Sequence, residues 1–187
     1  MIGVRDSKGV TTLENLTSKK RSKTYTFEPG EAPLALVALD RERPNGSPSS
    51  VEIVLAANLK SPLVLILPDP EDPAGMRAIA MEDGVDGFPW GSLRFLNTTA
   101  EPLVIRCDKE TKTIPAKSEA LDLAPGGEAR NIGVQLLSEA DSDVILYSAV
   151  WEHDPSLRKL VLITASPDPE VKEPVLEIIP QDKRAQD

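Results

Sequence analysis

The chain has 187 residues, of which 40% are apolar, and it carries a formal net charge of −9. This length suits one large domain or two small ones, and the negative charge argues against a nucleic-acid partner, because no extended basic patch offsets it. The single cysteine excludes an intramolecular disulfide, and one cysteine with one histidine supplies too few soft ligands for a zinc site.

The sequence also shows no membrane or targeting segment. No apolar stretch approaches the roughly 18 residues of a transmembrane helix. The first residues, Met1 to Leu16, lack the apolar core of a signal peptide. We therefore expect no membrane span and no signal peptide, and predict neither a metal site nor a cofactor.

Short apolar runs bounded by Pro, Gly, Asn or Asp dominate the chain and favour β-strands. In chain order, the expected strands are 23–27, 51–56, 63–67, 76–81, 92–97, 103–107, 111–114, 120–123, 131–136, 144–151, 160–163 and 175–179. Segment 33–41 is ambiguous, since its Ala and Leu residues also favour a short helix. The runs 63–67, 144–151 and 160–163 are apolar on both faces and are candidates for central strands. We predict an all-β fold with little helix, built from antiparallel, immunoglobulin-like β-sandwiches.

An ordered series of similar segments predicts two related halves. The matched pairs are Glu14–Thr17 with Leu96–Thr99, Pro29-Gly30 with Pro125-Gly126, and Pro68–Glu71 with Pro167–Glu170. The second copy has an insertion, long enough for one hairpin, between its Asn and its Pro-Gly. We therefore expect an N-terminal half at 1–84, a C-terminal half at 88–180 and a frayed tail at 181–187. A hinge is expected near Gly84 to Gly87.

One segment of the second half carries a resemblance. Residues 88–99 read Phe-Pro-Trp-Gly-Ser-Leu-Arg-Phe-Leu-Asn-Thr-Thr. This resembles the Phe-Pro-x-Gly-Ser-x-Arg-x-x-Asn pattern of a Verrucomicrobia-type bacterial β-sandwich family that has no assigned activity. The resemblance continues loosely to residue 180, through Pro102-Leu103, Pro125-Gly126, Ser148–Trp151 and Arg158–Ile163. It implies an exported or periplasmic setting, although the chain shows no signal peptide.

Four residues are candidates for a binding site. Trp90 and Trp151 have the side chains that stack on sugar rings in carbohydrate-binding sandwiches. Arg94 alternates outward from its strand, so we expect a surface charge there. His153 lies between Glu152 and Asp154, but neighbouring residues of a strand point to opposite faces, and Asp154-Pro155 indicates a turn.

No residue pattern predicts catalysis. Cys107 lies in a strand-like run, where a buried apolar role is expected. The sequence has no Gly-x-Ser-x-Gly nucleophile motif to pair with His153. The acidic loops at 69–72 and 168–170 are interpreted as solvated turns rather than calcium sites.

The preferred hypothesis is therefore a non-catalytic structural or protein-interaction module that works through sheet surfaces, edges or loops. The alternative is a carbohydrate-binding accessory module, and an enzyme is third. If a site exists, we expect it near Phe88 to Gly91, between the two halves. The sequence leaves the partner and the oligomeric state open.

Overall fold

The structure is a computed structural model that describes residues 1–28, 30–31, 33–43, 46–117, 120–168 and 170–185. Pro29, Pro169 and the last two residues of the predicted tail lie outside the described residues. The fold is all-β, with 51% of the chain in strands and 2% helical. The helical part is the short 3-10 helix Lys183–Ala185. The prediction of an all-β fold with little helix is confirmed.

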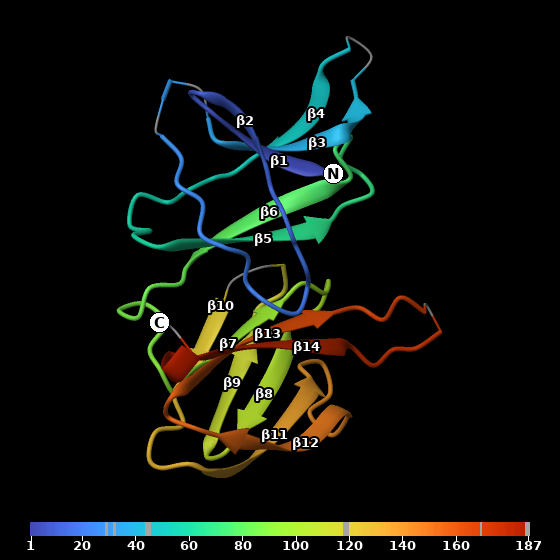
Figure 1. Cartoon of the computed structure of the whole chain (residues 1–187). Coiled ribbons are helices and arrows are strands. Elements are labelled where there is room, and N and C mark those ends of the chain that lie inside the picture. Colours follow the sequence, from blue (N-terminus) through green and yellow to red (C-terminus); the bar gives the residue numbers. More distant parts are fainter. Residues whose placement is uncertain (29, 32, 44–45, 118–119, 169, 186–187) are drawn as a thin grey trace. The chain divides into compact units, whose positions relative to one another are not determined.

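The chain divides into two compact units, Met1–Gly84 and Val85–Asp187, which we call the N-terminal and C-terminal units. Each has its own hydrophobic core between two sheets. The strands of both units are labelled in Figure 1. The units are described separately below.

The N-terminal unit packs a four-stranded sheet against a hairpin (Figure 1). The sheet has the order β2-β1-β3-β4 and the hairpin is β5-β6, all pairs being antiparallel. The bounds are β1 (Ile2–Asp6), β2 (Gly9–Thr12), β3 (Ala35–Glu42), β4 (Pro48–Glu52), β5 (Pro62–Pro68) and β6 (Met76–Glu82). Alternate residues of these strands, including Val4, Leu36 and Met76, meet in the core.

The C-terminal unit packs two four-stranded sheets face to face. Their orders are β10-β7-β13-β14 and β12-β11-β8-β9. The bounds are β7 (Leu93–Asn97), β8 (Leu103–Cys107), β9 (Glu110–Ile114), β10 (Ala120–Leu123), β11 (Arg130–Ser138), β12 (Ile145–His153), β13 (Leu157–Thr164) and β14 (Val175–Asp182). The β7–β13 pair is parallel, whereas the other pairs are antiparallel. Phe95, Ile105, Leu136 and Val161 are fully buried between the sheets.

Several elements differ from their predicted form. Segment 33–41 contributes the strand β3, because its Leu36 and Ala38 pack into the core, which overrides their helix propensity. The strands β1 and β2 were not predicted, and segment 23–27 is not a strand. Of the three predicted central strands, β13 is central, but β5 and β12 lie at sheet edges. Residues 181–185 of the predicted tail are not frayed, since β14 continues to Asp182 and Arg184 pairs with Asp154 and Asp182.

The two units share a strand order. In each, a hairpin with a two-residue turn (β1-β2, β8-β9) pairs through its first strand with the first strand of a second hairpin (β3-β4, β11-β12). A third hairpin (β5-β6, β13-β14) lies in the opposing sheet, to which the C-terminal unit adds β7 and β10. Asn15 and Asn97, which were matched in sequence, hold different places in this order, because Asn15 follows the first hairpin whereas Asn97 precedes it.

Candidate functional site

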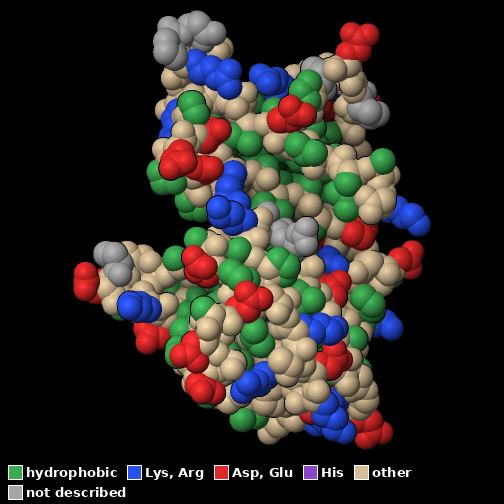
Figure 2. Space-filling view, turned by 180° about the vertical axis from the view of Figure 1, so that it is seen from behind, with side chains coloured by type: hydrophobic (Ala, Val, Ile, Leu, Met, Phe, Trp, Pro, Cys, Tyr) green, Lys and Arg blue, Asp and Glu red, His purple; other side chains and the backbone are tan. Residues whose placement is uncertain are grey.

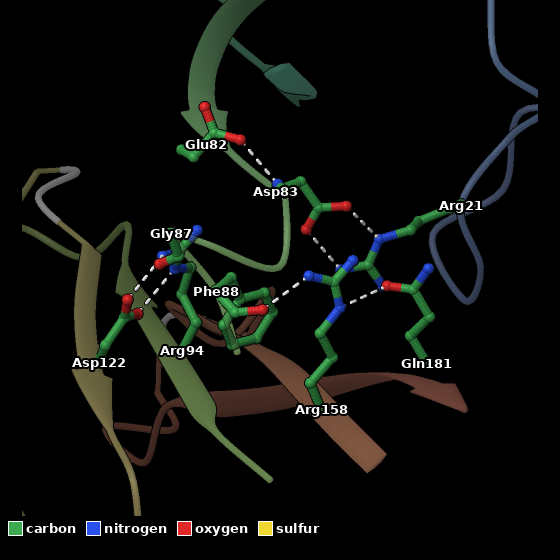
Figure 3. Close-up of polar contacts among 10 residues, drawn as sticks. Arg21, Glu82, Asp83, Gly87, Phe88, Arg94, Asp122, Arg158 and Gln181 are labelled. Carbon is green, nitrogen blue, oxygen red and sulfur yellow. Dashed lines mark hydrogen bonds and ion pairs between the residues drawn. The ribbon is translucent and has the colours of Figure 1, made fainter. Parts of the chain in front are cut away.

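The segment that carries the family-like pattern stabilises the C-terminal unit. Phe88 is fully buried, with the Arg94 guanidinium 4.4 Å and the Arg158 guanidinium 5.1 Å from its ring centre. Arg158 also donates to the Phe88 carbonyl and to Gln181, both at 2.7 Å (Figure 3). Gly91 has a φ of 80°, which favours glycine, and it turns the chain into β7. These contacts give the segment a structural role.

Arg94 is not the expected surface charge. It is buried, and its Nε and Nη2 donate to the two carboxylate oxygens of Asp122 on β10 at 2.7 and 2.5 Å (Figure 3). Its Nη2 also donates to the Gly87 carbonyl at 2.8 Å. The alternation along β7 was read correctly, but its second face is covered as well, so every residue of β7 is buried. Arg94 is therefore corrected from a candidate binding residue to a structural one.

The two tryptophans are packed to different degrees. Trp151 is part of the core, where it stacks on Phe95 at 6.2 Å and donates from its indole N–H to the Tyr147 hydroxyl at 3.0 Å. Trp90 is half-buried, and the guanidinium of Arg158 lies 4.8 Å from its ring centre. This arrangement is typical of side chains that pack within a domain.

His153 and Cys107 are both buried in the C-terminal unit. His153 ends β12, and its Nε2 has no hydrogen-bond partner among the described residues. Cys107 faces the core from β8, and burial, followed by the charges of Asp108 and Glu110, raises the pKa of its thiol to about 11. The thiol is therefore protonated near neutral pH and is a poor nucleophile. Of the four candidates, Trp151 and Arg94 pack inside the C-terminal unit, and the His153 ring lies beside Gly91, the residue after Trp90.

The N-terminal unit holds the strongest candidate, an open groove of about 500 Å³ along β5. We call it the β5 groove. Its floor is the core of the unit, including Val4, Leu36 and Ile53. One wall is β5, and the other is the segment Arg21–Phe27. A groove of this kind, apolar at its base and bordered by backbone, suits an elongated ligand.

The wall formed by β5 has an unpaired backbone edge. Ser61 accepts a hydrogen bond from Asp83 N–H at 2.8 Å, and Asp69 N–H donates to Gly75 at 3.1 Å, so the odd-numbered residues bond toward β6. The β5–β6 register is continuous between these two points. The N–H and C=O groups of Val64 and Ile66 therefore point away from β6. Within the part of the chain that the structure describes, neither residue has another backbone partner.

The opposite wall, Arg21–Phe27, is extended but pairs with no strand of the described chain. Tyr25 and Phe27 stack with ring centres 6.2 Å apart, and Phe27 packs on the core. The Tyr25 hydroxyl accepts the N–H of Glu14 at 2.8 Å, and Lys23 pairs with Glu14 at 2.9 Å. These contacts attach the wall to Glu14, and the groove lies between this wall and β5.

The charged residues that line the groove are Arg21, Lys23 and Asp83. Arg21 pairs with Asp83 through two hydrogen bonds of 2.8 and 2.9 Å (Figure 3). Glu82 accepts the N–H groups of Lys60 and Gly84, which hold the pKa of its carboxyl below the usual range. These acids are occupied in fixing the start and end of the β5-β6 hairpin. No cluster of metal-ligating side chains is found among the described residues.

The groove was not predicted, although two signals pointed to it. The run 63–67 is apolar on both faces, as in a central strand, yet β5 lies at an edge. Segment 23–27 has the alternation of a strand but lacks a strand partner in the described chain. Both are explained if a further strand belongs between them. In the segment Phe88 to Gly91, where a site was predicted, Phe88 is buried under Arg94 and Trp90 lies beside Arg158, whereas Pro89 is exposed.

The described chain has no helix that is long and apolar enough to cross a membrane. On the face drawn in Figure 2, acidic and basic side chains are interspersed, and the basic ones do not form one continuous patch. Comparison of the sequence with protein-family models gives no match, and neither does comparison with curated proteins.

Proposed function

We propose that the chain is a non-catalytic protein-interaction module and that its N-terminal unit binds a partner in the β5 groove. The observation that carries this proposal is the unpaired edge at Val64 and Ile66 beside an apolar groove. Such an edge is a template for strand addition, in which main-chain hydrogen bonds give affinity and side-chain pockets give specificity. Proteins that do not use an edge usually cover it or place charges on it.

The edge of β5 is protected at its ends and open in its middle. Pro62 and Pro68, at the two ends of the strand, have no N–H to offer. Between them, the side chains are apolar and partly exposed. This pattern restricts pairing to a short stretch, which suits binding of one segment better than growth of a continuous sheet.

We also infer that the two units arose by duplication, with the C-terminal unit keeping two more strands. The shared order of the three hairpins supports this inference, as do the Pro-Gly pairs in the sequence before β11 and before β3. The immunoglobulin-like description stays a prediction, as does the bacterial, exported setting.

Carbohydrate binding receives less support. Stacking on a sugar needs an open aromatic face, whereas Trp151 is 7% exposed and Trp90 lies beside the Arg158 guanidinium. An enzymatic role receives little support from the buried His153 and from the raised pKa of Cys107.

The test is a selection of random peptides on the full chain, followed by binding measurements on two variants. Leu55 lines the groove and is 44% exposed, whereas its neighbour Val54 does not line it and is 75% exposed. Selected peptides should bind the wild type and Val54→Asp equally and bind Leu55→Asp at least about tenfold more weakly. Failure to enrich any binder, or binders that are indifferent to Leu55→Asp, would refute the proposal.

A further inference from the structure

We propose that the β5 groove receives one extended polypeptide segment, which pairs in parallel with β5 as β7 pairs with β13 in the C-terminal unit. This inference rests on the proposed function and adds the conformation, direction and side-chain pattern of the ligand. The C-terminal unit supplies the argument, because it shows what occupies the corresponding place.

The edge of β13 that holds β7 matches the open edge of β5. Gly91 N–H donates to Leu157 at 2.7 Å, and Lys159 N–H donates to Ser92 at 3.0 Å, so the odd-numbered residues of β13 bond toward β7. The same odd-numbered set includes Val161 and Ile163, which face the core. In β5, Val64 and Ile66 likewise face the core and direct their backbone groups to the open edge. The two edges therefore have the same orientation relative to their cores.

The far wall of the groove matches β10. Leu121 and Leu123 of β10 face the core of the C-terminal unit, two residues apart and just before a Pro-Gly turn. Tyr25 and Phe27 have the same spacing before the Pro-Gly at residues 29–30, and both line the groove. In the C-terminal unit, β7 lies between β10 and β13. The place between segment 24–27 and β5 is therefore the position of β7, and the groove occupies it.

The floor indicates which side chains the segment carries. Leu36 of β3 pairs with Val51, and Leu136 of β11 pairs with Tyr147. When these two pairs are aligned, Leu55 corresponds to Trp151, because Leu55 lies four residues after Val51 and Trp151 lies four residues after Tyr147. Trp151 is 7% exposed because Phe95 of β7 stacks on it, whereas Leu55 is 44% exposed. The ligand should therefore alternate apolar and other residues and place a large apolar side chain against Leu55.

The experiment uses a capped synthetic peptide that spans Trp90–Thr99 of this chain, added to the full-length protein. Its own β7 keeps the C-terminal site filled, since a tethered strand has a high effective concentration. Binding is measured for the wild type, Leu55→Asp and Val54→Asp at up to about 1 mM peptide. A spin label at either peptide end then reports direction, through broadening of the amide signals of β5 in the NMR spectrum.

The proposal requires saturable binding that Leu55→Asp weakens by at least about tenfold and that Val54→Asp leaves within about twofold. It also requires that a label at the peptide's N-terminus broadens amides near Leu63, and one at its C-terminus those near Leu67. The opposite label pattern would overturn the parallel arrangement and leave the proposed function standing. If selected peptides bind in the groove but the Trp90–Thr99 peptide does not, this inference is overturned and the proposed function again stands. Leu55-dependent self-association without peptide binding would make a second copy the occupant and overturn the inference. If neither kind of peptide binds, the proposed function is lost as well.

Discussion

Arg94 brings a charge into the C-terminal unit, and Asp122, Gly87 and Phe88 are among the groups that contact its guanidinium. Asp122 supplies two oxygens, the Gly87 carbonyl a third, and the ring of Phe88 lies 4.4 Å away. A buried ion pair adds little net stability, because both charges lose their hydration. Removal of one partner is nevertheless costly, because the other charge then stays buried without it.

Asp122→Asn should therefore lower the free energy of unfolding of the C-terminal unit by about 2–3 kcal/mol, because the buried Arg94 keeps its charge and loses the charge of the Asp122 carboxylate that it contacts twice. The midpoint of denaturation, followed by tryptophan fluorescence, measures the loss. Glu128→Gln, a change at an exposed site with the same loss of charge, is the control and should shift the midpoint little. A stability equal to that of the control would show that the pair is unimportant.

Cys107 provides a pH-dependent prediction. The pKa of its thiol is raised from 9.0 to about 11 by burial in the folded unit. A raised pKa means that the folded state favours the protonated thiol, so this stabilisation is complete below pH 9 and is lost as the pH rises toward 11. The wild type should therefore lose stability between these values relative to Cys107→Ala, which has no thiol to titrate. A constant difference between the two proteins across this range would contradict the assigned burial effect.

At the scale of elements, local alternation predicted most strands, because successive residues of a half-buried strand point to opposite faces and therefore alternate between apolar and polar. β11 and β8 were found in this way. The strands β1 and β2 were missed, since β2 is exposed throughout and β1 carries only two large apolar residues, Ile2 and Val4. The β5 groove was missed for another reason: strand order is a long-range property, so the apolar faces of 63–67 and the alternation of 23–27 do not say which strands are neighbours.

The open edge of β5 predicts an alternation in amide hydrogen exchange. The N–H groups of Leu63, Leu65 and Leu67 bond toward β6, whereas those of Val64 and Ile66 face the groove. The first set should exchange at least about tenfold more slowly than the second, because exchange requires an unbonded amide. In β13, the amides of odd-numbered and even-numbered residues should both be protected from exchange, since β7 lies on one side of this strand and β14 on the other. Equal protection of Val64 and Leu65 would mean that the edge is already paired.

At the scale of the whole molecule, the two units differ in how completely their sheets are built. The C-terminal unit has four strands on each side of its core, and the N-terminal unit has four on one side and two on the other. Fewer strands leave more apolar surface in contact with water and more backbone groups without protein partners. The N-terminal unit should therefore be the less stable of the two, with its own unfolding transition.

The aromatic residues allow the two transitions to be followed separately. Both tryptophans, Trp90 and Trp151, belong to the C-terminal unit, so intrinsic tryptophan fluorescence reports that unit, while far-UV circular dichroism reports the strands of both. Denaturation of the full chain should begin at lower denaturant by circular dichroism than by fluorescence, since non-coincident probes are the mark of more than one transition. A ligand that completes the β5 groove should raise the first transition by mass action and leave the fluorescence curve unchanged. Coincident curves would instead show that the two units unfold as one, and that the incomplete sheet of the N-terminal unit costs it no measurable stability.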